Sequence, residues 1–380
     1  MIQNIPNIGE LRSLLQSNEK RTAAFIGAGL SVEVGIDSWK NVLTKMAQKY
    51  SPKINIDKRR GEGVTYPQIA AEICKCIPYE DYRDYLAEQF KPKDLPFALI
   101  HTKVTAAFKI ILTTNYDAGF EEAYKAHNQV NKLHNLPEID YCKQKLPNFK
   151  FDEILLKPVI VYLHGNNDDK RYIFKQDEYE SYYPANYGIK KHSILEKYLN
   201  DIFDNYNIVF IGFSFDDEDF NKCFQRSLVE NKKKRQEQIS TIEVVHHEKN
   251  IYDGKCPKYF AIIPRNEIEE TVEKETVLSI FKNKVGWDKY FRNPSDDKLE
   301  FIDDIERKVV NIQFKGIRDD IEALLNDSKR AKIKATFLKE NGIIPIPFEK
   351  GKYAQIYQLL EDILNPKAFA ISDIKDASKT

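Results

Sequence analysis

The sequence predicts an α/β protein with a doubly wound, mostly parallel sheet and helical insertions. Short apolar runs alternate with helical patterns along most of the chain. Four successive runs end in small or polar residues: GAGLS, TTNYD, LHG and GFS. In doubly wound sheets, ligands bind beyond the carboxyl ends of the strands. The same pattern therefore predicts the fold class and the edge of the sheet that carries the site.

The core elements follow from local patterns of apolar residues. The expected strands are TAAFIG before residue 28, 109–117, 158–165, 207–215 and 258–266. The expected helices are 8–19, 38–50, two or three between 67 and 108, 191–206 and 216–238. The last of these is acidic in its first turn and basic near its end, as the helix dipole favours. Two segments, 51–66 and 126–157, are expected to be loop and irregular chain.

Beyond residue 266 the pattern changes. We interpret the whole chain, 1–380, as a single catalytic domain with insertions. The expected parts are a helical insert or lid at 51–108, a charged helical insert at 267–332, a returning core strand and helix at 333–365, and a polar tail at 366–380. An aromatic cluster in the charged insert, Trp287, Tyr290 and Phe291, is either a contact surface for a partner or a local core.

Composition excludes several classes of protein. Lys+Arg and Asp+Glu are both 58, so the formal net charge is zero, and direct nucleic-acid binding is not expected. The five cysteines include no CxxC pair, which argues against a disulfide framework and a four-cysteine zinc site. No apolar run approaches the roughly 18 residues of a membrane span, and no leader pattern is present. A soluble, cytoplasmic protein is expected.

The first strand ends in a glycine turn, Gly27-Ala28-Gly29-Leu30-Ser31. Such a turn lets a ligand approach the backbone, and the amides that follow can hold phosphate. The sixth position of the dinucleotide pattern G-x-G-x-x-G is Val32, which argues against an ordinary dehydrogenase. A glycine turn without a ligand stays the alternative.

The other strand ends supply candidate catalytic groups. Taken singly, Asn115 fits a turn residue, Asp117 a helix N-cap and His164 a core histidine. Their common place at the ends of neighbouring strands favours a binding site instead. Tyr116 could stack on a ligand or pack in the core, and the His246-His247 pair fits a surface turn.

In order, GAGLSVEVGI, TTNYD, LHG and GFS resemble the GAGxSxxxGI, QNxD, HG and GTS motifs of the sirtuin (SIR2) family. GIDSWKNVL and TTNYD resemble the bacterial SIR2-like proteins of antiphage defence, notably the SIR2 subunit of SIR2–HerA systems. The resemblance covers 20–265 and 333–365. Two features depart from deacylating sirtuins: the two CxxC pairs of the zinc ribbon are missing, and Ser38-Trp39-Lys40 replaces D-F-R. These departures put acyl transfer in doubt.

The resemblance implies a sirtuin-type, Rossmann-like sheet without a zinc ribbon, and an NAD+ glycohydrolase that releases nicotinamide and ADP-ribose as an abortive-infection effector. It assigns Asn115 to the ribose hydroxyls and water, Asp117 to the nicotinamide carboxamide, and His164 to proton transfer near neutral pH. The implied NAD+-binding residues are Gly27, Ala28, Gly29, Ser31, Thr114, Gly212 and Ser214. No metal is expected.

The resemblance also implies a homo-oligomer with a partner, a HerA-type ATPase or less often a short Argonaute, and no membrane association. Two other functions stay open. One is an NAD-dependent protein deacylase, and the other is a non-catalytic module that senses NAD or ADP-ribose.

Overall fold

The computed structural model describes residues 7–16, 22–93, 95–145, 157–242, 257–268, 315–349 and 354–364. The elements up to the second strand are α1 (Ile8–Gln16), β1 (Thr22–Ile26), the 3-10 helix η2 (Ala28–Val34), α2 (Trp39–Tyr50), α3 (Ile56–Gly61), α4 (Tyr66–Cys74), α5 (Tyr79–Gln89), α6 (Leu99–Ala107) and β2 (Ile110–Thr113). Next come α7 (Gly119–Leu133), β3 (Cys142–Lys145), β4 (Val159–Tyr162), β5 (Gly165–Asn166), β6 (Arg171–Tyr172), α8 (Gln176–Tyr182), η4 (Pro184–Tyr187) and α9 (Ile194–Asn205). The last are β7 (Asn207–Ile211), α10 (Glu218–Ile242), β8 (Tyr259–Pro264), η5 (Arg265–Glu267), α13 (Lys315–Glu340), β9 (Ile343–Phe348) and α14 (Ala354–Leu364).

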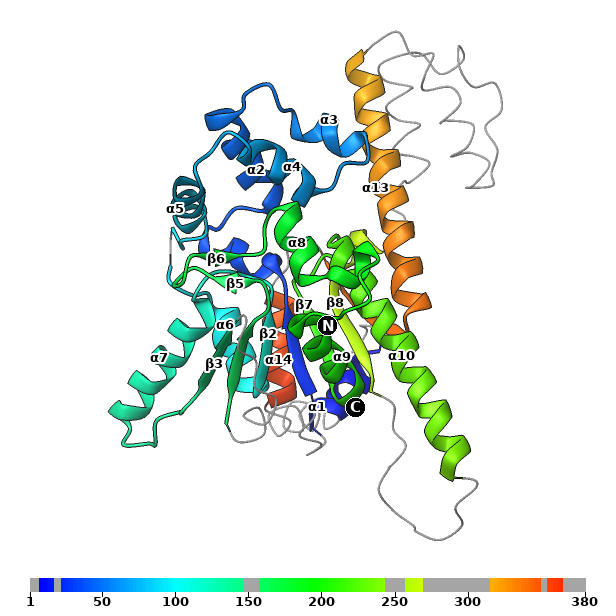
Figure 1. Ribbon diagram of the computed structural model, residues 1–380. Coiled ribbons are helices and arrows are strands. Elements are labelled where there is room, and N and C mark those ends of the chain that lie inside the picture. Colours follow the sequence, from blue (N-terminus) through cyan, green and yellow to red (C-terminus); the bar gives the residue numbers. More distant parts are fainter. Residues whose placement is uncertain are drawn as a thin grey trace, which may run out of the picture.

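The main sheet has seven strands in the order β3-β4-β2-β1-β7-β8-β9 (Figure 1). Every neighbouring pair in it is parallel. The chain fills one side of β1 with β2, β4 and β3 and then crosses to β7 on the other side. The switch point of the sheet therefore lies at β1 and β7, where doubly wound folds bind ligands. The predicted fold class is confirmed.

The two faces of the sheet carry two separate cores. Along β1, Ala24 and Ile26 pack on one face with α2, α4, α6 and α14, while Ala23 and Phe25 pack on the other with α8, α9 and α10. Successive strand residues point to opposite faces, so a strand buried on both sides reads as a continuous apolar run. This is why the central strands were recognisable from sequence.

Two segments differ from the sequence prediction. Residues 126–157, expected to be irregular, contain the end of α7 and the edge strand β3, Cys142–Lys145. An edge strand pairs with only one neighbour, here β4, and its polar sequence CKQK carries no apolar signal. The expected loop at 51–66 contains α3, which Asn55 caps by accepting from the Lys58 amide at 2.9 Å.

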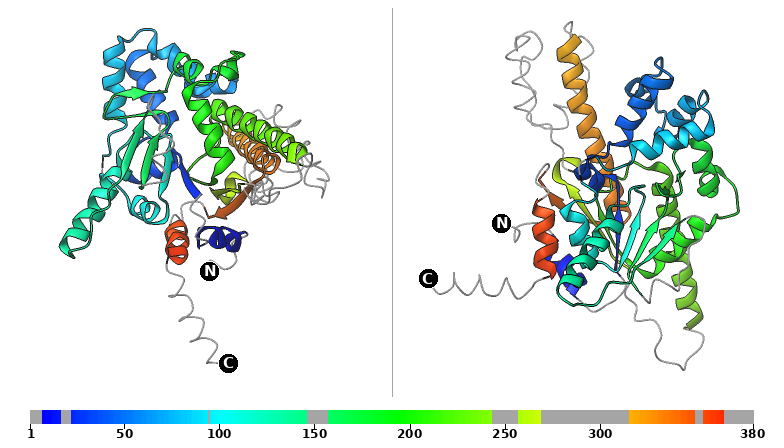
Figure 2. Two further views of the ribbon diagram at one scale, coloured as in Figure 1. Left: turned by 60° about the horizontal axis from the view of Figure 1, so that its bottom comes forward. Right: turned by 90° about the vertical axis from the view of Figure 1, so that its left-hand side faces the viewer.

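Long helices frame the sheet, and α2, α3 and α4 gather at one end of it (Figure 1). α13 and α10 extend past the sheet at opposite ends of it (Figure 1; Figure 2, right). The end of α13 packs against the core through Phe337 and Leu338, and β9 then joins the sheet beside β8. No helix among the described residues is long and apolar enough to cross a membrane. The aromatic cluster at 287–291, the His246-His247 pair and the tail lie outside the described residues.

Candidate active site

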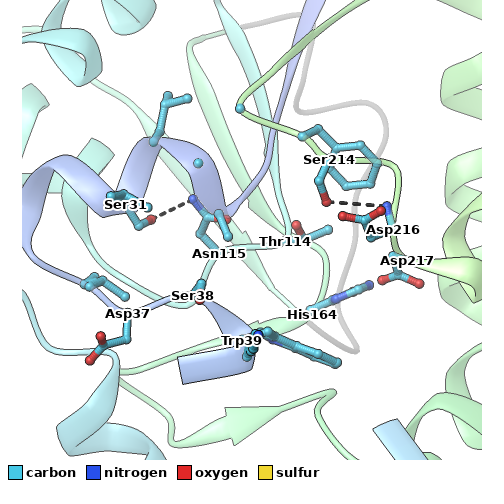
Figure 3. Close-up of a pocket in the computed structure, with 18 of the residues that line it drawn as sticks. Ser31, Asp37, Ser38, Trp39, Thr114, Asn115, His164, Ser214, Asp216 and Asp217 are labelled. Atoms are coloured by element: carbon cyan, nitrogen blue, oxygen red, sulfur yellow. Dashed lines mark hydrogen bonds between the residues drawn. The ribbon is translucent and has the colours of Figure 1, made fainter. Parts of the chain in front are cut away.

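A cavity of about 440 Å³ opens at the carboxyl ends of the central strands (Figure 3). Its size is typical of a small-molecule site. Of the residues predicted for the site it is lined by Ala28, Gly29, Ser31, Thr114, Asn115, Asp117, His164, Gly212 and Ser214. Gly27 does not line it and is buried at the N-terminal end of η2. Four motifs spread over some 190 residues of sequence thus converge on one cavity.

The glycines of the first motif have a packing role that sequence did not reveal. A Cβ on Gly27 would lie 2.6 Å from the carbonyl oxygen of Gly212 and from the Cα of Phe213. The Gly29 amide donates to that same carbonyl at 2.9 Å, and a Cβ there would approach it to 2.9 Å. The GAG turn after β1 is therefore pressed against the GFS turn after β7, backbone on backbone. Close approach to a ligand is not the only reason for these glycines.

Ser31, Asn115 and Asp117 form one buried hydrogen-bonded network. Asn115 Nδ2 donates to the Gly27 carbonyl at 3.0 Å and to Ser31 Oγ at 2.8 Å. Ser31 Oγ in turn donates to Asp117 Oδ2 at 2.6 Å. Thr113 Oγ1, at the end of β2, accepts from the Asn115 amide at 3.0 Å and fixes its backbone. The network joins the ends of β1 and β2.

One atom of this network has no partner. Asn115 Oδ1 is buried and accepts no hydrogen bond among the described residues. A buried acceptor without a partner costs about 1–3 kcal/mol, so native structures keep one where water or a ligand completes the site. Since the Nδ2 donors fix the amide orientation, this oxygen stays an acceptor.

Asp117 and Tyr116 also have structural roles. Asp117 Oδ1 accepts from the Gly119 amide at 2.9 Å, at the start of α7, so the helix-cap and binding-site interpretations of Asp117 are compatible. Tyr116 lines the cavity, but its hydroxyl donates to the Ile173 carbonyl at 2.7 Å and its ring packs edge-on against Tyr172. For Tyr116 the packing interpretation is the better supported one.

His164 lies at the end of β4 and is almost fully buried. Its Nε2 lies 2.7 Å from the Tyr183 hydroxyl, and its ring stands edge-on to Tyr179. Burial lowers the pKa of His164 to about 3. A lowered pKa keeps the imidazole neutral near pH 7, so proton transfer by His164 at that pH stays a prediction that this burial does not favour.

This burial predicts acid sensitivity. Between the ordinary histidine pKa and about 3, the unfolded chain holds a proton that folded His164 does not, so the free energy of unfolding falls as pH falls. The His164 contribution is at most about 1.4 kcal/mol per pH unit. Urea midpoints at pH 7, 6 and 5 should therefore fall more steeply for wild type than for His164→Gln. His101 and Asp217, whose pKa values are shifted down and up, are common to both proteins and cancel in the comparison. Parallel slopes would contradict the buried neutral imidazole.

Several residues of the cavity escaped the sequence analysis. Trp39, Tyr179 and Asp217 line it together with His164. Asp217 directly precedes α10, in an acidic stretch that the sequence analysis explained by the helix dipole alone. The far wall comes from the C-terminal elements, with Phe348 and Tyr357 among its residues, and the Tyr357 hydroxyl contacts the Glu33 carboxylate. No short motif marks these contacts.

The lining is rich in carboxylates and holds two cations, Lys40 and Arg60. Lys40 also pairs with Asp57 at 2.6 Å, and Arg60 lies 4.5 Å over the Tyr66 ring. Asp37 is neutralised by Lys45 and Lys93, whose hydrogen bonds lower its pKa. Among the described residues, no group of three or more His, Cys, Asp or Glu side chains is arranged to hold a metal.

The fold and the site define a class: a doubly wound α/β domain whose ligand cavity is built from Gly-rich, Asn/Asp and His strand ends. Residues 109–280 match the family model described as the SIR2-like domain. The match includes TTNYD, LHG and GFS, and the glycine turn at 27–31 precedes it.

Two curated relatives are similar over about half of the chain. The NAD(+) hydrolase ThsA of Bacillus cereus (strain MSX-D12) is 26% identical over 217 residues, which is 55% of this chain and 40% of that protein. The NAD(+) hydrolase ThsA of Enterococcus faecium is 28% identical over 224 residues, 56% of this chain and 41% of that protein. The matched region thus spans about two fifths of the length of these relatives.

Proposed function

We propose that this protein is an NAD+ glycohydrolase that cleaves NAD+ to nicotinamide and ADP-ribose. The observation that carries the proposal is the unpaired, buried Oδ1 of Asn115 at a cavity shared with His164, in a SIR2-like domain. The relatives named as NAD(+) hydrolases support the same reaction. The cavity lies at the switch point of the sheet, where doubly wound folds bind nucleotides, and this position supports the proposal.

Cleavage of NAD+ depends on positioning of the substrate and stabilisation of charge more than on general acid catalysis. The bond that breaks joins ribose C1' to a pyridinium nitrogen, and nicotinamide leaves as a neutral molecule. The protonated leaving group of ordinary glycosidases is therefore not needed. We assign Asn115 Oδ1 to a ribose hydroxyl or the attacking water, and Asp117 to the nicotinamide carboxamide. The carboxylates of the lining would favour the positive charge that develops on the ribose.

The neutral His164 has a specific task in this scheme. An unprotonated ring nitrogen accepts a hydrogen bond from a ribose hydroxyl without adding positive charge beside the developing cation. Ala28, Gly29 and Ser31 of the first turn, and Gly212 and Ser214 of the turn after β7, would hold the pyrophosphate and the adenosine ribose. Thr114 lines the cavity between Ser31 and Ser214 (Figure 3) and would contact NAD+ as well.

One incubation distinguishes the proposal from its two alternatives. The pure protein is mixed with NAD+ and an acylated lysine peptide, and the products are separated chromatographically. We expect free ADP-ribose and nicotinamide in equal amounts. O-acyl-ADP-ribose would instead establish a deacylase, and intact NAD+ with measurable binding would establish a sensing module.

The biological role that we propose is depletion of NAD+ during phage infection. Because unregulated cleavage would kill the host, we propose that the protein self-assembles and is held weakly active until a partner acts, with a HerA-type ATPase favoured over a short Argonaute. Cellular NAD+ measured during infection, with and without the genomic neighbour, tests this control. Full activity of an isolated monomer would refute the control and leave the chemistry intact.

A further inference from the structure

We propose that Asp217 is a catalytic residue of this site and takes the proton from the water that attacks ribose C1'. This inference rests on the proposed NAD+ hydrolysis and adds the base that the reaction needs. It replaces His164 in that role and leaves His164 as a hydrogen-bond acceptor.

The Asp217 carboxylate is held at the cavity by two fixed donors. Oδ1 accepts from the Phe220 amide at 3.0 Å, which caps α10, and Oδ2 accepts from the Tyr179 hydroxyl at 3.0 Å. Asp217 lines the same cavity as Asn115 and His164, and Figure 3 shows the three around it. The acceptor lone pairs that these donors leave unused can receive a hydrogen bond from water.

Tyr179 connects Asp217 to His164. The ring of Tyr179 stands edge-on to His164 with centroids 5.6 Å apart, while its hydroxyl reaches Asp217. The Tyr183 ring stacks on Tyr179 at 5.9 Å and its hydroxyl engages His164 Nε2. Tyr179, on α8, and Tyr183, the residue after this helix, thus hold the Asp217 carboxylate and the His164 imidazole in place.

The proton affinities of the two groups favour Asp217 as the base. Burial lowers the pKa of His164 to about 3, so its imidazole is a weak base. Burial, opposed by the Phe220 amide and reinforced by the charge of Asp219, raises the pKa of Asp217 to about 6. A base with a pKa near the working pH is the most efficient. The ionisable groups around Asp217 are Asp219 and Cys223 of α10, Tyr179 of α8, and the nearby Tyr183 and Tyr116.

The step balances. The water oxygen forms a bond to C1' as the C1'–N bond breaks, and the electron pair of that bond stays on nicotinamide, which becomes neutral. The water proton moves to the Asp217 carboxylate and is then released to solvent. The net reaction is NAD+ plus water giving ADP-ribose, nicotinamide and one proton.

Asp217→Asn tests the role without removing the local structure. Asparagine caps helices as well as aspartate does, with its Oδ1 accepting from the Phe220 amide, and its Nδ2 can then donate to the Tyr179 hydroxyl oxygen. We expect nicotinamide release to fall by about 10²–10⁴-fold. NAD+ affinity, measured by calorimetry, should change by less than about threefold, a change in free energy below 1 kcal/mol. The wild-type decline in kcat below about pH 6 should disappear in the variant.

The matched control is Asp201→Asn, an equal charge change at an exposed position of α9. Its rate and pH profile should equal those of wild type. A purely structural role predicts normal activity for Asp217→Asn and loss only for Asp217→Ala, which removes the cap. Activity of Asp217→Asn within tenfold of wild type, or an unchanged pH profile, therefore overturns the assignment alone. A wild-type protein that binds NAD+ and leaves it intact overturns the proposed function and this inference together.

Discussion

Asn115→Ala should abolish measurable nicotinamide release while the protein stays folded. The substitution removes the buried Oδ1 assigned to the ribose or water and the Nδ2 that orients Ser31. Losing a fixed polar contact to the reacting centre lowers rates by about 10²–10³-fold. Stability should fall only by about 1–2 kcal/mol, because two hydrogen bonds are lost while an unpaired buried acceptor is removed as well.

The measurement is nicotinamide release by wild type and variant at saturating NAD+, with circular dichroism to confirm folding. Asn205→Ala is the control, since Asn205 is exposed at the end of α9 and bonds only the Asp201 carbonyl among its described contacts. It should keep full activity. An Asn115→Ala protein that retains more than a tenth of wild-type activity would show that the site is wrongly assigned.

Gly165→Ala should be among the most destabilising single substitutions in the chain. Gly165 follows His164 and has φ +92°, a left-handed conformation that alanine adopts at a cost of about 1–2 kcal/mol. A Cβ there would also collide with the carbonyl oxygen of Arg171 in the β5–β6 hairpin. The backbone of Gly165 and that of Arg171 cannot move apart without disturbing the hairpin. We therefore expect the free energy of unfolding to fall by more than about 3 kcal/mol in total.

Gly188→Ala separates the two costs. Gly188 has φ +80°, but nothing lies within 4 Å of a Cβ built on it. The free energy of unfolding of this variant should therefore fall by the conformational cost alone, roughly 1–2 kcal/mol, and the urea midpoint should fall in proportion. The urea midpoint of Gly165→Ala should lie well below that of Gly188→Ala. The Gly165 variant should also lose activity, since the collision displaces His164. Equal midpoints for the two variants would mean that the hairpin does not close on Gly165 as described.

The sequence determined the fold class and much of the sheet because those features depend on short, local patterns of apolar and polar residues. Strands buried on both faces, such as β1, β2, β4, β7 and β8, are continuous apolar runs. The carboxyl ends of parallel strands meet at one edge, so residues at those ends converge whatever the loops do. That is why Asn115, Asp117 and His164 could be grouped from sequence, and the cavity does bring them together.

Other features depend on residues far apart in the chain, and only the tertiary structure decided them. The edge strand β3 has a polar sequence, so its pairing with β4 shows only in the assembled sheet. Gly27 is fixed by contact with Gly212, about 185 residues later, and the far wall of the cavity comes from Phe348 and Tyr357. Neither contact leaves a local pattern.

Proton affinities were decided in the same way. A histidine and an aspartate carry ordinary pKa values in the sequence, and desolvation shifts them only after the fold has packed Tyr179 and Tyr183 around them. Burial makes His164 a weak base and gives Asp217 a pKa of about 6. The sequence determined which chemical groups meet at the site, and packing of the surrounding chain decided which of them can carry a proton near neutral pH.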